Sequence, residues 1–119
     1  MDEKKPLIYS CSGCSSAAQM ANYIAVKIDR LGIAEMSCIV GVGGGVKKLL
    51  RTAKSGREII VVDGCPLACS KACLKKYDLS ADLHIDLSIL GVSKRKHEDF
   101  DQVEADSILE KLIEKLSRI

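Results

Sequence analysis

The chain has 119 residues, 47% of them hydrophobic, and its 18 Lys and Arg residues exceed its 16 Asp and Glu residues by two. This length suits one domain with one hydrophobic core, so we expect residues 1–119 to form a single domain. The balanced charge provides no strong electrostatic field, and three Tyr, one Phe and no Trp provide few stacking surfaces. These features exclude nucleic acid and an acidic membrane surface as expected partners.

The amino-terminal residues, MDEKKP, are polar, and only a few apolar residues follow them. This segment is too short and too polar for a signal peptide or a membrane span. We therefore expect a cytoplasmic protein, in which thiols stay reduced. The six cysteines of the chain then indicate metal binding or thiol chemistry rather than a disulfide framework.

Short apolar runs alternate with segments of helical period along the chain. A serine at position 15 or 16 can cap the first helix, and Gly32 suits the left-handed conformation that ends it. The run EIIVVD at 58–63 is apolar without alternation and predicts a buried central strand, whereas residues 83–89 alternate and predict an edge strand with one wet face. The expected elements are strands at 7–10, 36–40, 58–63 and 83–89, helices at 16–31, 46–54, from 66 and from 101, and a glycine-rich loop at 41–45.

Strands that alternate with helices predict an α/β fold in three layers, α/β/α. We expect a four-stranded, mainly parallel sheet of the Rossmann or flavodoxin-like order 2-1-3-4. In such a sheet, ligands bind beyond the carboxyl ends of the strands, where the strand order reverses. Five cysteines follow the predicted strand ends, and we expect all five to face one crevice there: Cys11, Cys14, Cys38, Cys65 and Cys69.

Metal geometry limits which thiols can act together, because four sulfurs about 2.3 Å from one zinc ion lie within roughly 4 Å of one another. Cys65 and Cys69 meet this limit on the first turn of a helix that begins at Pro66. The N–H groups of that turn would also stabilise a Cys65 thiolate. Cys73 would lie about 12 Å from Cys65 along the helix. We therefore expect Cys73 outside the site, as a small core residue.

The other polar motifs favour structural roles. The stretch GVGGGVKK at 41–48 lacks the last glycine of a dinucleotide-binding loop and the Ser or Thr of a P-loop. Its glycines are expected instead to let the backbone pass close to the cysteine site. Asp63 is expected to cap the turn after its strand. His84 and His97 are expected to be solvated.

The chain resembles the DGC-domain family of zinc-binding proteins over nearly its whole length. The motifs that carry the resemblance are CSG at 11–13, MSC at 36–38, DGCPLAC at 63–69 and LGVSK at 90–94. The resemblance implies that four cysteines bind Zn²⁺, namely Cys11, Cys38, Cys65 and Cys69.

Cys14 is an addition to the family pattern, and it leaves two ligand sets open. A zinc-knuckle interpretation would combine Cys11 and Cys14 with Cys65 and Cys69, whereas the family pattern uses Cys38 in place of Cys14. Either set would form a tetrathiolate site at the carboxyl ends of the strands.

Three functions agree with this pattern. The favoured one is a cysteine-rich zinc-binding protein, in which four thiolates leave no open position for a metal-bound water and hence no metal-based catalysis. The second is a thiol enzyme, either a sulfur carrier or sulfurtransferase or a redox protein, in which Cys65 or Cys11 attacks and a neighbouring cysteine resolves. The third is an iron–sulfur cluster on the same cysteines. The sequence thus favours a metal-binding protein over an enzyme and identifies no protein partner.

Overall fold

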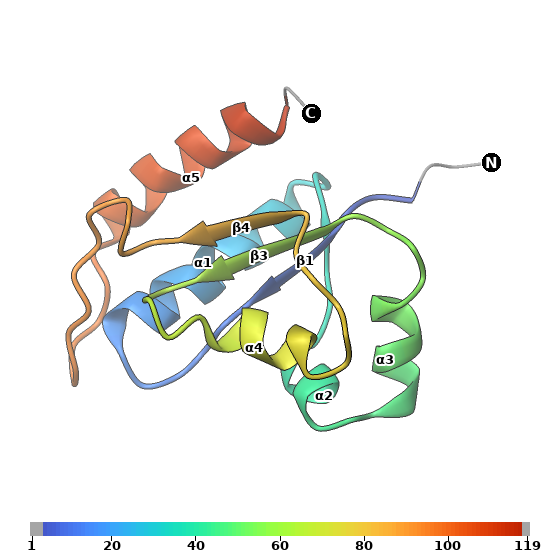
Figure 1. Ribbon diagram of the computed structural model, residues 1–119. Coiled ribbons are helices and arrows are strands. Elements are labelled where there is room, and N and C mark those ends of the chain that lie inside the picture. The colour runs from blue at the N-terminus through green and yellow to red at the C-terminus, as the bar shows by residue number, and fades with distance from the viewer. Residues whose placement is uncertain (1–3, 118–119) are drawn as a thin grey trace.

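The computed structural model describes residues 4–117, which form a three-layer α/β/α fold (Figure 1). Within these residues one sheet has four strands in the order β2-β1-β3-β4, and all neighbouring strands are parallel. The predicted fold class and strand order are therefore confirmed. The strands are β1 (Leu7–Ser10), β2 (Glu35–Met36), β3 (Ile59–Asp63) and β4 (Leu83–Asp86), and the helices are α1 (Ser16–Arg30), α2 (Ile39–Gly43), α3 (Lys47–Ala53), α4 (Cys69–Lys75) and α5 (Gln102–Leu116).

Strand β3 lies between β1 and β4, and all five of its residues are buried. Successive side chains of a strand point to opposite faces of the sheet. Ile60 and Val62 accordingly pack with α1 and α5, whereas Val61 packs with residues of α2, α3 and α4. Figure 1 shows the two sets of helices on opposite faces of the sheet. The continuous apolar run of β3 is explained by this cover on both faces.

Helix α1 has the ends that its sequence predicts. The Ser15 Oγ accepts a hydrogen bond from the N–H of Ala18 at 3.1 Å and so caps the first turn. Gly32 follows the helix with a φ of 78°, the left-handed conformation that glycine adopts without steric cost. None of the helices in residues 4–117 is long and apolar enough to cross a membrane.

The second strand is shorter than predicted, because the chain turns into α2 at Ile39 rather than continuing as a strand to Val40. Of the glycine-rich segment at 41–45, expected to be a loop, residues 41–43 belong to this helix, and Gly44 and Gly45 form the turn that follows it. Cys38 caps the helix, with its Sγ accepting the N–H of Gly41 at 3.4 Å. Tertiary packing of α2 has overridden the strand preference of its Val and Ile residues.

The glycines of α2 allow that packing. A Cβ atom on Gly41 would stand 1.9 Å from the Leu49 Cδ1, and one on Gly43 would stand 2.9 Å from the Cys73 Sγ. Both contacts are closer than non-bonded heavy atoms tolerate. The glycines therefore let α2 lie close to α3 and α4, and the thiol that they approach is that of Cys73.

Strand β4 ends at Asp86 instead of continuing to residue 89. The Asp86 carboxylate accepts hydrogen bonds from the N–H of Ser88 at 2.9 Å and from its hydroxyl at 2.6 Å. This local turn competes with continued strand pairing, as carboxylates at such positions commonly do. The alternating pattern of residues 83–89 therefore includes a turn.

Candidate functional site

A crevice of about 180 Å³ opens beyond the carboxyl ends of β1 and β3. The loop after β1, the loop after β3 and the segment at 94–96 supply its walls. Four thiols line it, those of Cys11, Cys14, Cys65 and Cys69. Parallel strands β1 and β3 pair over Leu7–Ser10 and Ile59–Val62, so their loops leave the same edge of the sheet side by side. Sheet topology has thus gathered thiols that are far apart in the sequence.

Cys38 and Cys73 do not line this crevice. Strand β2 ends at Met36, and Cys38 is the residue that caps the start of α2. The expectation that all five strand-end cysteines face one crevice is therefore wrong for Cys38. Cys73 is half-buried beside Gly43, outside the crevice as expected.

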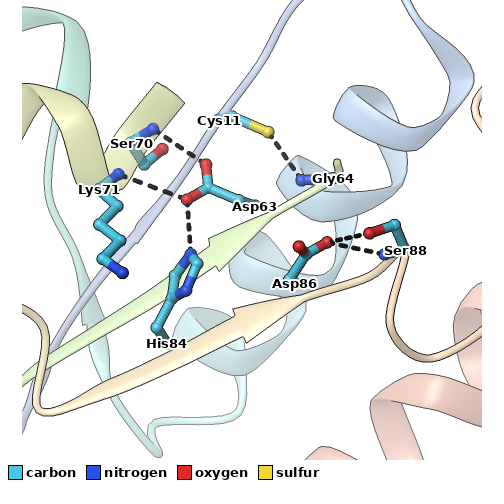
Figure 2. Close-up of polar contacts among 8 residues, drawn as sticks. All are labelled: Cys11, Asp63, Gly64, Ser70, Lys71, His84, Asp86 and Ser88. Atoms are coloured by element: carbon cyan, nitrogen blue, oxygen red, sulfur yellow. Dashed lines mark hydrogen bonds and ion pairs between the residues drawn. The ribbon is translucent and has the colours of Figure 1, made fainter. Parts of the chain in front are cut away.

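The thiol of Cys11 is held at the base of the crevice by the DGC motif. Its Sγ accepts a hydrogen bond from the N–H of Gly64 at 3.2 Å (Figure 2). Burial raises the pKa of the Cys11 thiol to about 11, and the nearby Asp63 carboxylate adds to the rise, whereas the Gly64 N–H opposes it. Metal-free Cys11 is consequently protonated at neutral pH.

Gly64 is confined by the start of α1. A Cβ atom at this position would stand 2.5 Å from the carbonyl oxygen of Ala17 and 2.8 Å from the backbone nitrogen of Ala18. These are backbone atoms of a capped helix, which cannot rotate away as a side chain can. The glycine of the DGC motif therefore lets the loop after β3 touch α1 and place its N–H on Cys11.

Asp63 is fully buried and accepts three hydrogen bonds (Figure 2). Its Oδ1 accepts the N–H of Ser70 at 2.9 Å, and its Oδ2 accepts the N–H of Lys71 at 3.3 Å. These bonds cap α4, as expected for Asp63. The Nε2 of His84 donates to the same Oδ2 at 2.9 Å, so the expectation of a solvated His84 is wrong. His97, in contrast, is exposed.

Helix α4 begins at Cys69 and not at Pro66. Ala68, immediately before it, has φ 50° and ψ 54°, the left-handed conformation that costs a non-glycine residue about 1 kcal/mol or more. Asp63 occupies two N–H groups of the first turn, at Ser70 and Lys71. The expected contact of helix N–H groups with Cys65 is thus absent, and Cys65 and Cys69 are joined by a turn.

A lysine stands beside Cys65 instead. The Nζ of Lys94 lies 3.6 Å from the Cys65 Sγ, and Lys94 and Lys96 both line the crevice. Lys94 ends the LGVSK motif, and nothing in the pattern of that motif indicates a role for the lysine. For His84 a signal did exist, because Asp63 and His84 occupy the same face of neighbouring parallel strands, with Val61 opposite His84.

The donor chemistry of the crevice suits a soft or borderline metal ion, because zinc binds thiolates in tetrahedral sites. The side chains are not arranged as a finished site, however. Within residues 4–117, no group of three or more Cys, His, Asp or Glu side chains is close enough to hold a metal ion. A metal would therefore require the thiols of the two loops to turn toward one another.

Comparison with known proteins gives a family. The model of the DGC domain matches residues 7–112. The anaerobic and virulence modulator AnvM of Pseudomonas aeruginosa strain PAO1 is 49% identical over 111 residues, a match that covers 93% of this chain and 85% of that protein. No solved structure matches the chain. The family match spans most of the chain, and the chain belongs to the DGC-domain family.

Proposed function

We propose that the chain is a zinc-binding protein whose ion is held by thiolates of the crevice. The observation that carries this proposal is the convergence of two cysteine-bearing loops on one small crevice, with four thiols in its lining. Four thiols supply the number and type of ligands that structural zinc takes in tetrathiolate sites.

Cys11, Cys65 and Cys69 are the proposed ligands that both ligand sets share. We assign the fourth position to Cys14, because its thiol lines the crevice with the other three. Cys38 instead sits at the start of α2, with its Sγ bonded to the N–H of Gly41. Ligation of a metal ion by Cys38 would compete with that bond.

A bound zinc ion would tie the loop after β1 to the loop after β3. The ligands must lose their protons on binding. Cys11, whose pKa is raised to about 11, would release a proton at neutral pH. The Asp63 carboxylate would stay out of the ligand set, because its oxygens already accept bonds from α4 and His84. Its part is to hold the start of α4, and with it Cys69, at the crevice.

A regulatory role accords with a closed thiolate site, which offers no open position for catalysis. The relative from P. aeruginosa is named as an anaerobic and virulence modulator. Thiolate sites respond to oxidants, because oxidised cysteine no longer ligates metal. We extend to this chain a role as a modulator whose metal occupancy depends on thiol reduction.

Anaerobic purification, followed by metal analysis and an ultraviolet-visible spectrum, tests the proposal. We expect a colourless protein with about one zinc ion per chain. A brown protein with iron and labile sulfide would refute zinc as the metal and would indicate an iron–sulfur cluster instead. A metal-free protein that takes up no zinc would refute metal binding altogether.

Three single variants then test the ligand set. Cys65→Ser should abolish zinc binding, whereas Cys73→Ser, which alters a half-buried thiol outside the crevice, should retain it. Cys14→Ala should lose zinc and Cys38→Ala should keep it. The opposite result for this last pair would give the fourth position to Cys38.

A further inference from the structure

The crevice combines thiols with cationic side chains. The Lys94 ammonium lies 3.6 Å from the Cys65 Sγ, and Lys96 also contributes to the lining. Within residues 4–117, Cys65 is the crevice thiol with a lysine Nζ at hydrogen-bonding distance. An ammonium in this position stabilises negative charge on the sulfur and on anything bound to it.

The segment that carries these lysines is fixed to α1. The N–H of Ser16 donates to the carbonyl oxygen of Arg95 at 2.8 Å, and the N–H of Arg95 donates to the Ser16 Oγ at 2.9 Å. An antiparallel bridge also joins Ser15 to Lys96. Lys94 and Lys96 flank the residue that makes both bonds to Ser16. Their backbone is therefore held at the mouth of the crevice.

No free carboxylate opposes the lysines in the lining. Asp63 is the acidic residue among the crevice-lining side chains of the described chain, and it is fully buried. Both of its oxygens are occupied, by the start of α4 and by His84. The exposed charge at the crevice is therefore that of the two lysines, which attracts an anion.

The size of the crevice narrows the class of anion. Sites for drug-sized ligands measure roughly 300–1,000 Å³. This crevice, at about 180 Å³, is smaller and suits an anion of a few heavy atoms. The crevice would not enclose a nucleotide or a peptide. The thiol at its wall favours an anion that contains electrophilic sulfur.

We propose that the metal-free crevice is an acceptor site for sulfane sulfur, in which Lys94 and Lys96 hold a small anionic donor of the thiosulfate class against the Cys65 sulfur. The Cys65 thiolate attacks the terminal sulfur of thiosulfate and forms a new S–S bond. The S–S bond of thiosulfate breaks, and its electron pair leaves with sulfite. The product is a Cys65 persulfide anion, so total charge and electron count are unchanged.

The two lysines would lower the electrostatic barrier to this reaction. A thiolate and thiosulfate are both anions and repel each other in water. The ammonium groups offset that repulsion as the donor enters, and they stabilise sulfite as it leaves. Cys11 is less suited to attack, because its Sγ accepts the Gly64 N–H, whereas the Cys65 Sγ lies beside the Lys94 ammonium. Cys65 is therefore the assigned acceptor.

The test uses the full chain, freed of metal with a chelator under anaerobic conditions and then incubated with thiosulfate. Intact-mass and peptide mass spectrometry locate the added sulfur, and a sulfite assay gives the rate. We compare Lys94→Gln with Lys75→Gln, a matched change of an exposed lysine that does not line the crevice. Cys65→Ser and Cys38→Ser form the corresponding pair of thiol variants.

We expect one added sulfur atom at Cys65, with sulfite released in equal amount. Lys94→Gln should slow the reaction at least about tenfold, the effect of losing a charge-assisted contact, and Lys75→Gln should leave the rate unchanged. Cys38→Ser should react normally. Sulfur spread evenly over exposed cysteines, or equal rates for the two lysine variants, would overturn the assignment.

The outcome is separable from that of the zinc proposal. Zinc content is measured on the same preparations before the chelator is added, and uptake is measured again after its removal. A chain that binds zinc but gains no sulfur refutes only the acceptor site. A chain that gains sulfur at Cys65 but never binds zinc refutes only the metal site.

Discussion

Replacing Gly64 by alanine tests the steric account of the DGC motif most directly. The added methyl would stand 2.5 Å from the Ala17 carbonyl oxygen, 2.6 Å from the Ala17 carbonyl carbon and 2.8 Å from the Ala18 nitrogen. All three are backbone atoms in the first turn of α1, next to the Ser15 cap. The clash can be relieved only by moving the loop after β3 away from the helix.

The expected loss of stability follows from the displacement of the loop after β3. Overpacking a well-packed core by one methyl group typically costs 1–3 kcal/mol. Here no flexible side chain can yield, and the move also breaks the bond from the Gly64 N–H to the Cys11 Sγ. We therefore expect Gly64→Ala to lower the free energy of unfolding by about 3 kcal/mol. With a typical urea dependence this lowers the midpoint of unfolding by about 1.5 M.

Gly13→Ala is the matched control, because it adds the same methyl group to the same crevice. Its Cβ would meet only the Ala18 Cβ, at 3.8 Å, which is ordinary van der Waals contact. Urea unfolding followed by circular dichroism should therefore separate the two variants clearly. Equal stability of Gly64→Ala and Gly13→Ala would refute the argument that α1 confines the DGC loop.

Three further changes test the surroundings of the crevice by urea unfolding of metal-free protein. Ala68→Gly should stabilise the fold by about 0.5 kcal/mol, because glycine adopts φ 50° without strain. Ala72→Gly, within α4, should destabilise it by about 1 kcal/mol. A loss of stability in both variants would contradict the strain assigned to Ala68. Asp63→Ala should lower the free energy of unfolding by about 3–5 kcal/mol, because three hydrogen-bond donors lose their acceptor. Asp63→Asn should lower it less, since an amide can accept one N–H and donate to His84. Equal losses for the two variants would argue against the hydrogen-bond account. Folding raises the pKa of Cys11 from 9.0 to about 11, so the protonated thiol contributes to the free energy of unfolding in full below pH 9, and this contribution is lost as pH rises toward 11. The loss is about 2 kcal/mol after allowance for solvent screening. Cys11→Ser should remove this part of the pH dependence of stability, and an unchanged pH profile in the variant would contradict the argument.

The sequence predicted most of what depends on local pattern. The helical period with Ser15 before it and Gly32 after it located α1, and the apolar run at 58–63 located the central strand. Alternation of strands and helices then predicted the sheet order 2-1-3-4, because right-handed crossovers leave few alternatives. The same topology brought Cys11 and Cys65 to one crevice, as expected.

The predictions that were wrong concern features that depend on contacts between distant elements. Ile39 and Val40 form a helix because glycines of α2 can lie against Leu49 and Cys73, and no local pattern reveals those neighbours. His84 was assigned to a wet face because β4 is an edge strand, yet its side chain reaches Asp63, which caps α4. Helix α4 begins at Cys69 rather than at the predicted Pro66 for the same reason, because Asp63 caps the N–H groups of Ser70 and Lys71.

The polar groups around the crevice divide into a set that is satisfied internally and a set that remains available. Asp63, His84 and the start of α4 satisfy one another, so this buried carboxylate anchors the site without adding free negative charge to it. Lys94 and Lys96 face the thiols with no such internal partner in the lining. A cluster of thiolates repels itself unless metal or cations compensate it, and both proposals meet that requirement, the first with zinc and the second with the lysines. Both proposals use the Cys65 sulfur, and a bound zinc ion would withdraw electron density from it and weaken it as a nucleophile. We therefore expect zinc binding and sulfur acceptance to compete for Cys65 if both proposals hold.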